Sequence, residues 1–232
     1  MAVKTHVRLR ATGEFACFSR PEFKVERVSY PVMTPSAARG MLEAIFWKPE
    51  FRWEVREIWV LQHGGEFVLL RNELEERQGQ TPILVEDKRQ QRASLVLKDV
   101  AYLILADLRL APHADAPLPK YLSQFERRLE RGQCHHQPYL GTREFAARFE
   151  PSDGSETPLP WDQDLGTMLF DLAFREDDQR QEMTFLRHGR EGTREAKGFA
   201  EALFFHARLT GGVLKVPQEK YLELYRLEGW QC

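Results

Sequence analysis

Few side chains in this sequence have the types and spacing that acid–base chemistry needs. Lys120 and Tyr121 are adjacent at the start of an expected helix, where backbone N–H groups favour an anion. Lysine, tyrosine and histidine can assist while RNA is cut by its own 2′-OH, which attacks the adjacent phosphate in line and needs no metal. The alternative interpretation is that Lys120 is a solvated lysine of a first helical turn and that Tyr121 belongs to the core.

Metal and cofactor chemistry has little support in the sequence. His135 and His136 are the only adjacent histidines, and Cys134 precedes them, but three consecutive side chains rarely converge on one metal. Asp177 and Asp178 are expected in a solvated turn, which leaves two-metal nuclease chemistry unsupported. The sequence also lacks the glycine-rich phosphate and dinucleotide motifs, and the short motifs of zinc peptidases and serine hydrolases. We therefore expect no metal and no cofactor.

Two stretches interleave Arg, Lys and His with aromatic residues, Gly and Pro. We call Phe15–Pro49 the first motif and Arg127–Phe145 the second motif. Cations for phosphates beside flat side chains for stacking are typical of a surface that holds folded or splayed nucleic acid. The alternative is that both motifs are half-buried strands and loops with ordinary solvated charges.

Composition describes an ordinary globular protein of 232 residues, 42% hydrophobic and 29% charged. A net charge of −2 argues against an indiscriminate polyanion binder, so any nucleic acid must meet a local basic surface. Three cysteines without a Cys-x-x-Cys pair fit a reducing compartment. The N-terminal residues lack the apolar run of a signal peptide, and no segment approaches a membrane span. These features predict a cytoplasmic protein that does not enter a membrane.

The hydrophobic pattern predicts an α+β chain in two parts. For residues 1–148 it predicts strands at His6–Phe18, Arg52–His63, Glu66–Leu70 and Ala93–Leu110, with Gly13 as a bulge in the first and a Gly64-Gly65 turn that joins the second to the third as its partner. It predicts helices from Thr34-Pro35 to Pro49 and over Lys120–Arg131, and Gly132 stops the second helix. This order indicates a ferredoxin-like (RRM-like) domain. For residues 149–232 it predicts a smaller antiparallel β-sheet domain, with strands at Thr167–Phe174, Met183–Arg187 and Ala202–Ala207 and a helix over Gln218–Leu227.

The motifs also carry a family resemblance. Four segments, Phe15–Tyr30, Thr34–Gly40, Leu42–Pro49 and Arg131–Phe145, resemble the type I-C CRISPR-associated Cas-five family, d (Dvulg) subtype. The resemblance covers residues 1–150 well and the remainder more loosely. Only a chance match would leave an unrelated α+β housekeeping domain.

The resemblance implies a RAMP protein with an N-terminal ferredoxin-like domain and a C-terminal β-sheet. It implies metal-independent cleavage of CRISPR precursor RNA at the base of the repeat hairpin. Such a protein then stays on the 5′ handle of the crRNA, as a subunit of the type I-C interference complex beside its backbone and large subunits. Double-stranded DNA is a further partner that the resemblance leaves open.

The family's catalytic positions are only partly retained. Phe46 stands where the family has a tyrosine near the end of the first helix, and Phe46 has no hydroxyl. The family's Lys-His pair aligns with Lys120 and Tyr121, so Lys120 remains the expected stabiliser of the transition-state charge. Tyr121 or His136 then supplies the missing proton transfer, or the site is built differently. The remaining alternative is a non-catalytic subunit that binds RNA and caps the 5′ handle.

Basic side chains of the two motifs are the expected RNA contacts. The candidates are Arg20, Lys24, Arg27, Arg39, Arg127, Arg128, His136 and Arg143. Phosphate contacts set the position of the RNA, while stacking and hydrogen bonds to unpaired bases set sequence preference. Each arginine has an alternative role as a brace that pairs with a carboxylate, for example Glu26 or Glu144.

Overall fold

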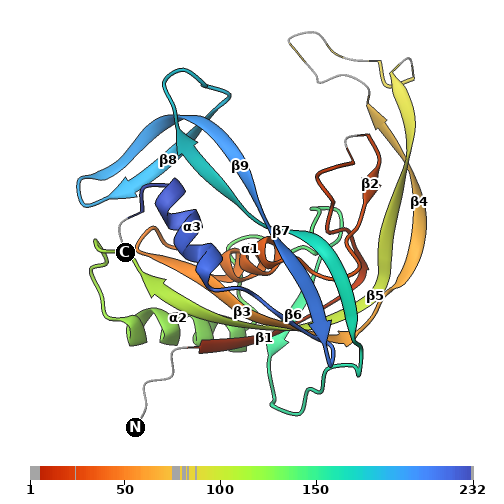
Figure 1. Cartoon of the computed structure of the whole chain (residues 1–232), viewed down its shortest axis with the longest axis horizontal. Coiled ribbons are helices and arrows are strands. Elements are labelled where there is room, and N and C mark those ends of the chain that lie inside the picture. Colours follow the sequence, from red (N-terminus) through yellow and green to blue (C-terminus); the bar gives the residue numbers. More distant parts are fainter. Residues whose placement is uncertain are drawn as a thin grey trace.

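The computed structural model describes residues 6–23, 25–74, 79, 82, 84–86 and 88–230. The strands are β1 (His6–Ala16), β2 (Arg27–Val28), β3 (Phe51–Gln62), β4 (Gly65–Leu74), β5 (Arg89–Leu110), β6 (Arg148–Pro151), β7 (Gln163–Glu176), β8 (Met183–Gly189), β9 (Gly192–Thr210) and β10 (Val213–Lys215). The helices are α1 (Pro35–Ile45), α2 (Leu118–Glu130) and α3 (Glu219–Leu227) (Figure 1). The chain is therefore α+β, and its long strands dominate.

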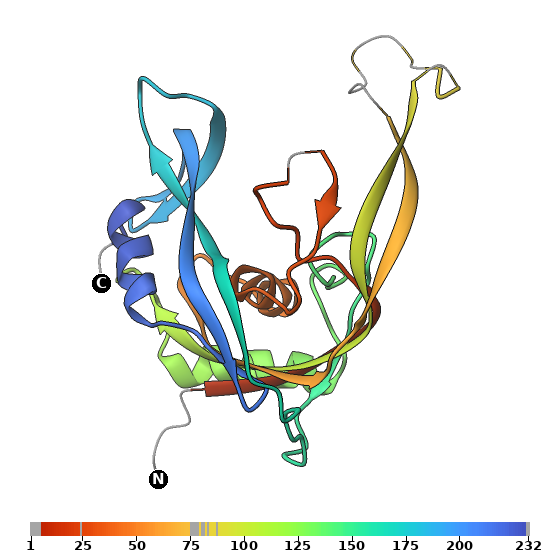
Figure 2. The ribbon, with the colours of Figure 1, turned by 45° about the vertical axis from the view of Figure 1, so that its right-hand side comes forward.

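One sheet runs through the molecule in the order β6-β1-β5-β3-β10-β9-β7, while β2 and β4 pair with β5, and β8 pairs with β9. The pairings are antiparallel except that of β2 with β5. The N-terminal part follows the order β1-α1-β3-β5-α2-β6 along the chain and β6-β1-β5-β3 across the sheet. In Figure 2, α1 is seen nearly end-on between the β7–β9 strands and the loop that carries β2. The first motif therefore lies on the concave side of the sheet.

Helix α1 forms where its capping residues predict it. The Thr34 hydroxyl accepts a hydrogen bond from the N–H of Ala37 at 3.3 Å, and Pro35 occupies the first turn, which needs no N–H from it. Leu42 and Ile45 are buried on the face that packs on the sheet. The helix ends at Ile45, before the proline that was expected to stop it.

Strand β5 changes partner along its length. Its second half pairs with β3 and its first half with β4, and Asp99 lies at the change with a left-handed φ of 61°. The expectation that β4 pairs back onto β3 is therefore wrong. A Cβ on Gly64 would lie 2.8 Å from the Lys98 carbonyl oxygen, so the turn residue itself is packed against β5. The paired β4 and β5 project from the sheet as an arm (Figure 2).

Gly13 does not form the expected bulge. The register between β1 and β5 continues unbroken past it, with Thr12 opposite Ala101 and Gly13 opposite Val100. A Cβ at Gly13 would stand 2.4 Å from a Leu140 side-chain methyl, and Leu140 is fully buried. The glycine instead makes room for the second motif to pack on β1.

The C-terminal part continues the same sheet. Strand β10 pairs with both β3 and β9, and its residue Leu214 lies opposite Ile58. Strand β6 pairs with β1, and α3 packs on β7, with the rings of Phe170 and Tyr221 4.8 Å apart. Buried residues of both parts, including Trp53 and Phe170, form one hydrophobic cluster. In the described residues, none of the helices is long and apolar enough to cross a membrane.

Candidate functional site

Phe46 caps the C-terminal end of α1, and its ring is buried. Its N–H donates to the Leu42 carbonyl at 2.9 Å, and its backbone is already extended. The ring lies 5.2 Å from the ring of Phe51 and 5.4 Å from the guanidinium carbon of Arg128. Phe46 therefore occupies the position that the family resemblance assigns to a tyrosine. The Arg128 guanidinium of α2 lies over its ring, but the ring itself has no ionisable group.

Tyr121 lies on the buried face of α2 and reaches Phe46 through Phe51. Its ring is 5.4 Å from that of Phe51, and its hydroxyl donates a hydrogen bond to Asp115 at 2.9 Å. Burial, helped by this hydrogen bond, raises the pKa of Tyr121 to about 12. The phenol thus keeps its proton at neutral pH, and that proton is already directed to a carboxylate. Tyr121 is both a core residue and a polar one.

Lys120 lies on the exposed face of the same helix. Its side chain has no ion pair among the residues that the structure describes. The expected anion-binding helix start is weaker than the sequence indicates, because Pro119 has no N–H and Lys120 donates its own to the Pro117 carbonyl at 3.0 Å. Any anion near this end of α2 would therefore meet the lysine side chain more than the backbone.

The second motif closes the C-terminal end of α1. The N–H groups of His135 and His136 point to the Ala44 carbonyl, at 2.7 and 3.4 Å. Arg128 donates to the Ile45 carbonyl at 2.9 Å. The indole N–H of Trp53 donates to the carbonyl of Phe46 at 3.1 Å. Carbonyls at a helix end have no partners within the helix, so these donors both satisfy them and hold the two motifs together.

His136 is exposed, as is the neighbouring His135. Its ring stacks on Tyr139 with centroids 6.4 Å apart, and it is tilted against His135 at 6.0 Å. Phe46, Tyr121, Arg128 and His136 are thus gathered around one helix end, although they come from three segments of the chain. Within the described residues, no three His, Cys, Asp or Glu side chains are placed to hold a metal ion.

The first-motif cations are partly committed to neighbours. The Nε of Arg20 donates to Glu22 at 2.8 Å, and its guanidinium carbon lies 5.0 Å from the centre of the Tyr30 ring. Lys24 lies outside the described residues. Arg20 remains half-exposed, so an incoming phosphate would compete with a surface carboxylate.

Glu144 of the second motif binds the first motif. Arg27 pairs with it at 3.2 Å, and Arg71 of β4 pairs with the same oxygen at 2.6 Å. The neighbouring Arg143 and, on α2, Arg127 are exposed and have no ion pair in the part of the chain that the structure describes. These two arginines are the RNA-contact candidates best placed to receive a phosphate.

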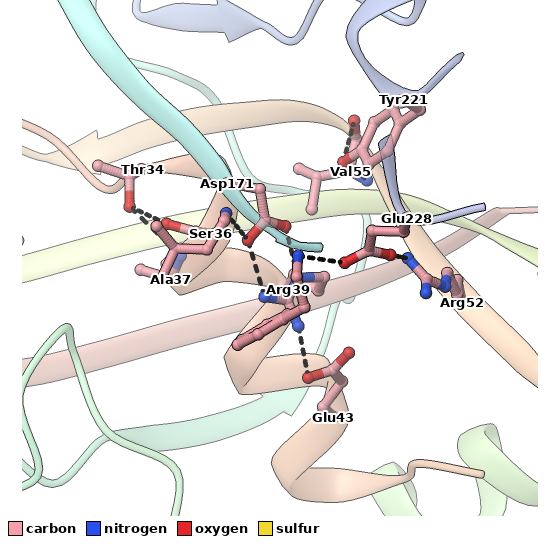
Figure 3. Close-up of polar contacts among 12 residues, drawn as sticks. Thr34, Ser36, Ala37, Arg39, Glu43, Arg52, Val55, Asp171, Tyr221 and Glu228 are labelled. Atoms are coloured by element: carbon pink, nitrogen blue, oxygen red, sulfur yellow. Dashed lines mark hydrogen bonds and ion pairs between the residues drawn. The ribbon is translucent and has the colours of Figure 1, made fainter. Parts of the chain in front are cut away.

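Arg39 is half-buried between α1 and β7, beside the buried carboxylate of Asp171. Two of its nitrogens donate to the Asp171 carboxylate at 2.7 and 2.8 Å, and a third donates to Glu43 at 2.7 Å (Figure 3). These carboxylates raise the pKa of Arg39 although burial opposes them. Each polar end of the guanidinium is thus occupied, and a phosphate would have to displace a buried carboxylate to reach it.

Sequence reasoning missed Lys48 and Asp115. The Lys48 ammonium lies 5.7 Å from the centre of the Tyr121 ring, two residues after Phe46. Asp115 accepts the hydrogen bond of the Tyr121 hydroxyl. The signal for Lys48 was present, since a cation directly follows Phe46-Trp47 at the helix end. Asp115 lies in a Pro/Ala/Asp segment, whose composition indicates only a linker.

By its fold, the chain belongs to the class of α+β proteins built on a long, mostly antiparallel sheet. Two solved structures share this fold: a CRISPR-associated protein (TM-score 0.63, 20% identity) and the functionally uncharacterized SMU1763c of Streptococcus mutans (TM-score 0.62, 18% identity). Each alignment covers 93% of both chains. The model of the Cas5d family, described as CRISPR-associated protein (Cas_Cas5), matches residues 6–217. The chain is therefore a member of the Cas5d family of CRISPR-associated proteins.

Two curated relatives are similar over nearly their whole length. One from Thermus thermophilus is 66% identical over 222 residues, 96% of each chain. One from Mannheimia succiniciproducens is 40% identical over 235 aligned residues, 91% of this chain and 94% of the relative. Both are named CRISPR pre-crRNA endoribonuclease Cas5d. The family resemblance of the two motifs is thereby confirmed.

Proposed function

We propose that this protein is a metal-independent endoribonuclease that cleaves CRISPR precursor RNA at the base of the repeat hairpin. The observation that carries the proposal is the 66% identity, over 96% of both chains, to a relative named for pre-crRNA cleavage. The gathering of Phe46, Tyr121, Arg128 and His136 around one helix end supports it. In this reaction the 2′-OH attacks the adjacent phosphate, and the leaving 5′-oxygen takes up a proton.

Three roles have to be filled, and the described side chains suit them unequally. Lys120, which is exposed and has no ion pair with another described residue, is suited to neutralise the charge that grows on the phosphate. His136 is exposed, and imidazole can both accept and donate a proton, so it is the better placed proton carrier. Tyr121 serves as a proton donor only if RNA draws its hydroxyl away from Asp115. Phe46 then contributes packing under the site and no proton.

Binding of the RNA follows the same division between free and paired cations. Arg127 and Arg143 contact phosphates, with Arg20 and Arg27 exchanging their surface carboxylates for RNA. Arg39 acts through the fold, and Arg128 through Phe46 and the end of α1. After cleavage the protein stays on the crRNA 5′ handle, in the cytoplasm, as a subunit of the type I-C interference complex with its backbone and large subunits. Double-stranded DNA bound by that complex is a further partner.

The domain division is part of the proposal. Residues 1–148 form a ferredoxin-like RAMP domain for RNA binding and processing, and residues 149–232 form the β-rich domain. The order β1-α1-β3-β5-α2-β6 supports the first. The division passes through β6, and both parts share one sheet and one core.

The test uses the purified protein in EDTA with the cognate repeat hairpin and a copy that carries a 2′-deoxy nucleotide at the cut. We expect a single cut in the RNA and none in the deoxy copy, with the cut lost in Lys120→Ala. His136→Ala and Tyr121→Phe then identify the proton carrier. Cleavage of the deoxy copy, or a requirement for a metal, would contradict the mechanism.

The second candidate is a subunit that binds the hairpin and caps the 5′ handle without cutting. Two observations favour it: Phe46 lacks the hydroxyl of the family's tyrosine, and the Tyr121 proton is committed to Asp115. Tight hairpin binding without a cut in the same experiment would select this function.

A further inference from the structure

A pocket of about 850 Å³ opens beside the residues gathered around the C-terminal end of α1. Its walls come from α1 and the segment after it (residues 47–53), from β7, from the β8–β9 hairpin and from α3. Its size falls within the range of small-ligand sites, which is about 300–1,000 Å³. Phe51 lines the pocket and at the same time contacts the rings of Phe46 and Tyr121, so the pocket adjoins the proposed cleavage site directly.

Most cations around this pocket are already paired. Arg39 binds Asp171, Arg52 binds Glu228, and both Arg187 and Arg194 bind Glu176. Lys48 and Arg190 differ, because neither has a carboxylate partner among the described residues. Arg190 donates only to the Pro112 carbonyl, at 3.4 Å, and Lys48 lies over the Tyr121 ring. The pocket therefore offers two positive charges to a ligand.

A flat aromatic side chain, Trp47, lines the same pocket. Trp47 precedes Lys48 and keeps 47% of its surface exposed, although it is large and apolar. Its ring makes an edge contact with His188, with centroids 5.5 Å apart. An exposed indole beside uncommitted cations is the combination that holds unpaired nucleotides, where bases stack on aromatic rings and cations hold the backbone.

We propose that this pocket takes one unpaired nucleotide of the RNA next to the cut, with its base stacked on Trp47 and its phosphates held by Lys48 and Arg190. This inference rests on the proposed function. Glu191, which also lines the pocket, suits an amino group of the base, since a carboxylate accepts such a hydrogen bond. Capture of that nucleotide would fix the strand beside Phe51 and so set which phosphate is cut.

The experiment is a double-mutant cycle between protein and RNA. Abasic nucleotides are placed one at a time in the unpaired segments that flank the repeat hairpin, and binding to wild type and Trp47→Ala is measured. On the wild type, one position is expected to weaken binding by between about 5-fold and about 150-fold, the range of base–aromatic stacking. On Trp47→Ala the same abasic position should change binding by less than about 2-fold, because the two losses are one interaction.

Matched variants separate stacking from damage to the fold. Trp47→Phe keeps an aromatic face and should restore most of the affinity, and binding should quench tryptophan fluorescence more in the wild type than in Trp47→Phe. Leu222→Ala removes an exposed apolar side chain of α3 outside the pocket and should bind as the wild type does.

The outcomes distinguish the two proposals. If the wild type binds and cuts the hairpin but Trp47→Ala shows the same affinity and the same abasic sensitivity, the nucleotide pocket is overturned and the endoribonuclease stands. If the wild type neither binds nor cuts, both are overturned. A coupled loss at one flanking nucleotide supports the pocket and identifies its occupant.

Discussion

Two regions of the molecule, the junction of α1 with β7 and the surface formed by α2 and the second motif, both carry basic side chains but differ in how these are paired. At the junction, Arg39 is bound to two carboxylates, and nearby Arg52 binds the buried Glu228. On α2 and in the second motif, Lys120, Arg127 and Arg143 are exposed without an ion pair in the described part of the chain. Similar basic side chains therefore differ in burial and pairing: those against buried carboxylates are held in place, and the exposed ones lack a carboxylate partner among the described residues.

The largest effect is expected from removing the buried carboxylate that holds Arg39. Asp171→Ala leaves Arg39 with Glu43 alone, in a position where two nitrogens have lost their acceptors. Breaking a fully buried pair costs about 3–5 kcal/mol, and because the Arg39 side chain keeps 28% of its surface exposed we expect the lower end, about 3 kcal/mol, in the free energy of unfolding measured with urea. Glu201→Ala, which removes an exposed pair with Arg175, should cost no more than about 1 kcal/mol. Equal stability of the two variants would show that Arg39 is no brace.

The opposite expectation holds for Lys120. Lys120→Ala should leave the unfolding transition unchanged and lower the single-turnover cleavage rate by about 10²–10³-fold, the effect of removing one group that stabilises transition-state charge. The measurement is the rate at saturating protein, so that weaker binding does not contribute. A normal rate would move the role to Lys48 or Arg128.

The proposed phosphate contacts of Arg127 and Arg143 should be visible in the salt dependence of RNA affinity. Arg127→Ala with Arg143→Ala removes two proposed phosphate contacts, each of which contributes about 0.7–0.9 to the slope of log affinity against log salt. We expect the slope to become shallower by about 1.5, at unchanged stability. Arg180→Ala, which removes an exposed arginine paired with Glu182, is the control and should leave the slope as it is.

Tyr121 combines the two properties compared above, because it is buried and also belongs to the candidate site. Tyr121→Phe removes the hydrogen bond to Asp115 and should lower the free energy of unfolding by about 1 kcal/mol. The pKa of Tyr121 is raised to about 12, so its stabilising effect is complete below the ordinary value near 10 and is lost as the pH rises through 12. The ratio of wild-type to Tyr121→Phe cleavage rates should therefore stay constant from pH 6 to 9. A ratio that changes with pH in this range would contradict the pKa assigned to the phenol.

Local chemistry made part of the fold predictable. Thr34 and Pro35 define the start of α1, and Gly132, with a φ of 61° and its N–H on the Leu129 carbonyl, ends α2 as its sequence position predicts. The partner of β4 was not predictable. Strand β5 changes partner at Asp99, whose left-handed backbone is not indicated by a glycine or by a turn motif in the sequence around it. Strand β9 (Gly192–Thr210) was predicted only over its apolar residues Ala202–Ala207, since its first residues are mostly polar and belong to a hairpin.

The candidate site was predictable in its residues more than in their roles. Arg39 and Asp171 are 132 positions apart, so no local pattern distinguishes this brace from a phosphate ligand. Part of the motif density reflects packing: a Cβ on Gly141 would lie 2.0 Å from the Cys17 carbonyl oxygen, where the second motif meets β1. Phe46 was located by the family resemblance alone, because a buried phenylalanine at a helix end gives no chemical signal.

The closure of α1 by the second motif has a consequence for synthesis on the ribosome. The donor and acceptor that join Arg128 to Ile45 are 83 positions apart, and at about 5–20 residues per second they are made roughly 4–17 s apart. During that interval the Ala44 and Ile45 carbonyls of α1 lack the donors that Arg128 and the second motif later supply. The nascent chain therefore contains the whole sequence of α1 and the basic first loop well before the α2 and second-motif residues that the proposed function needs.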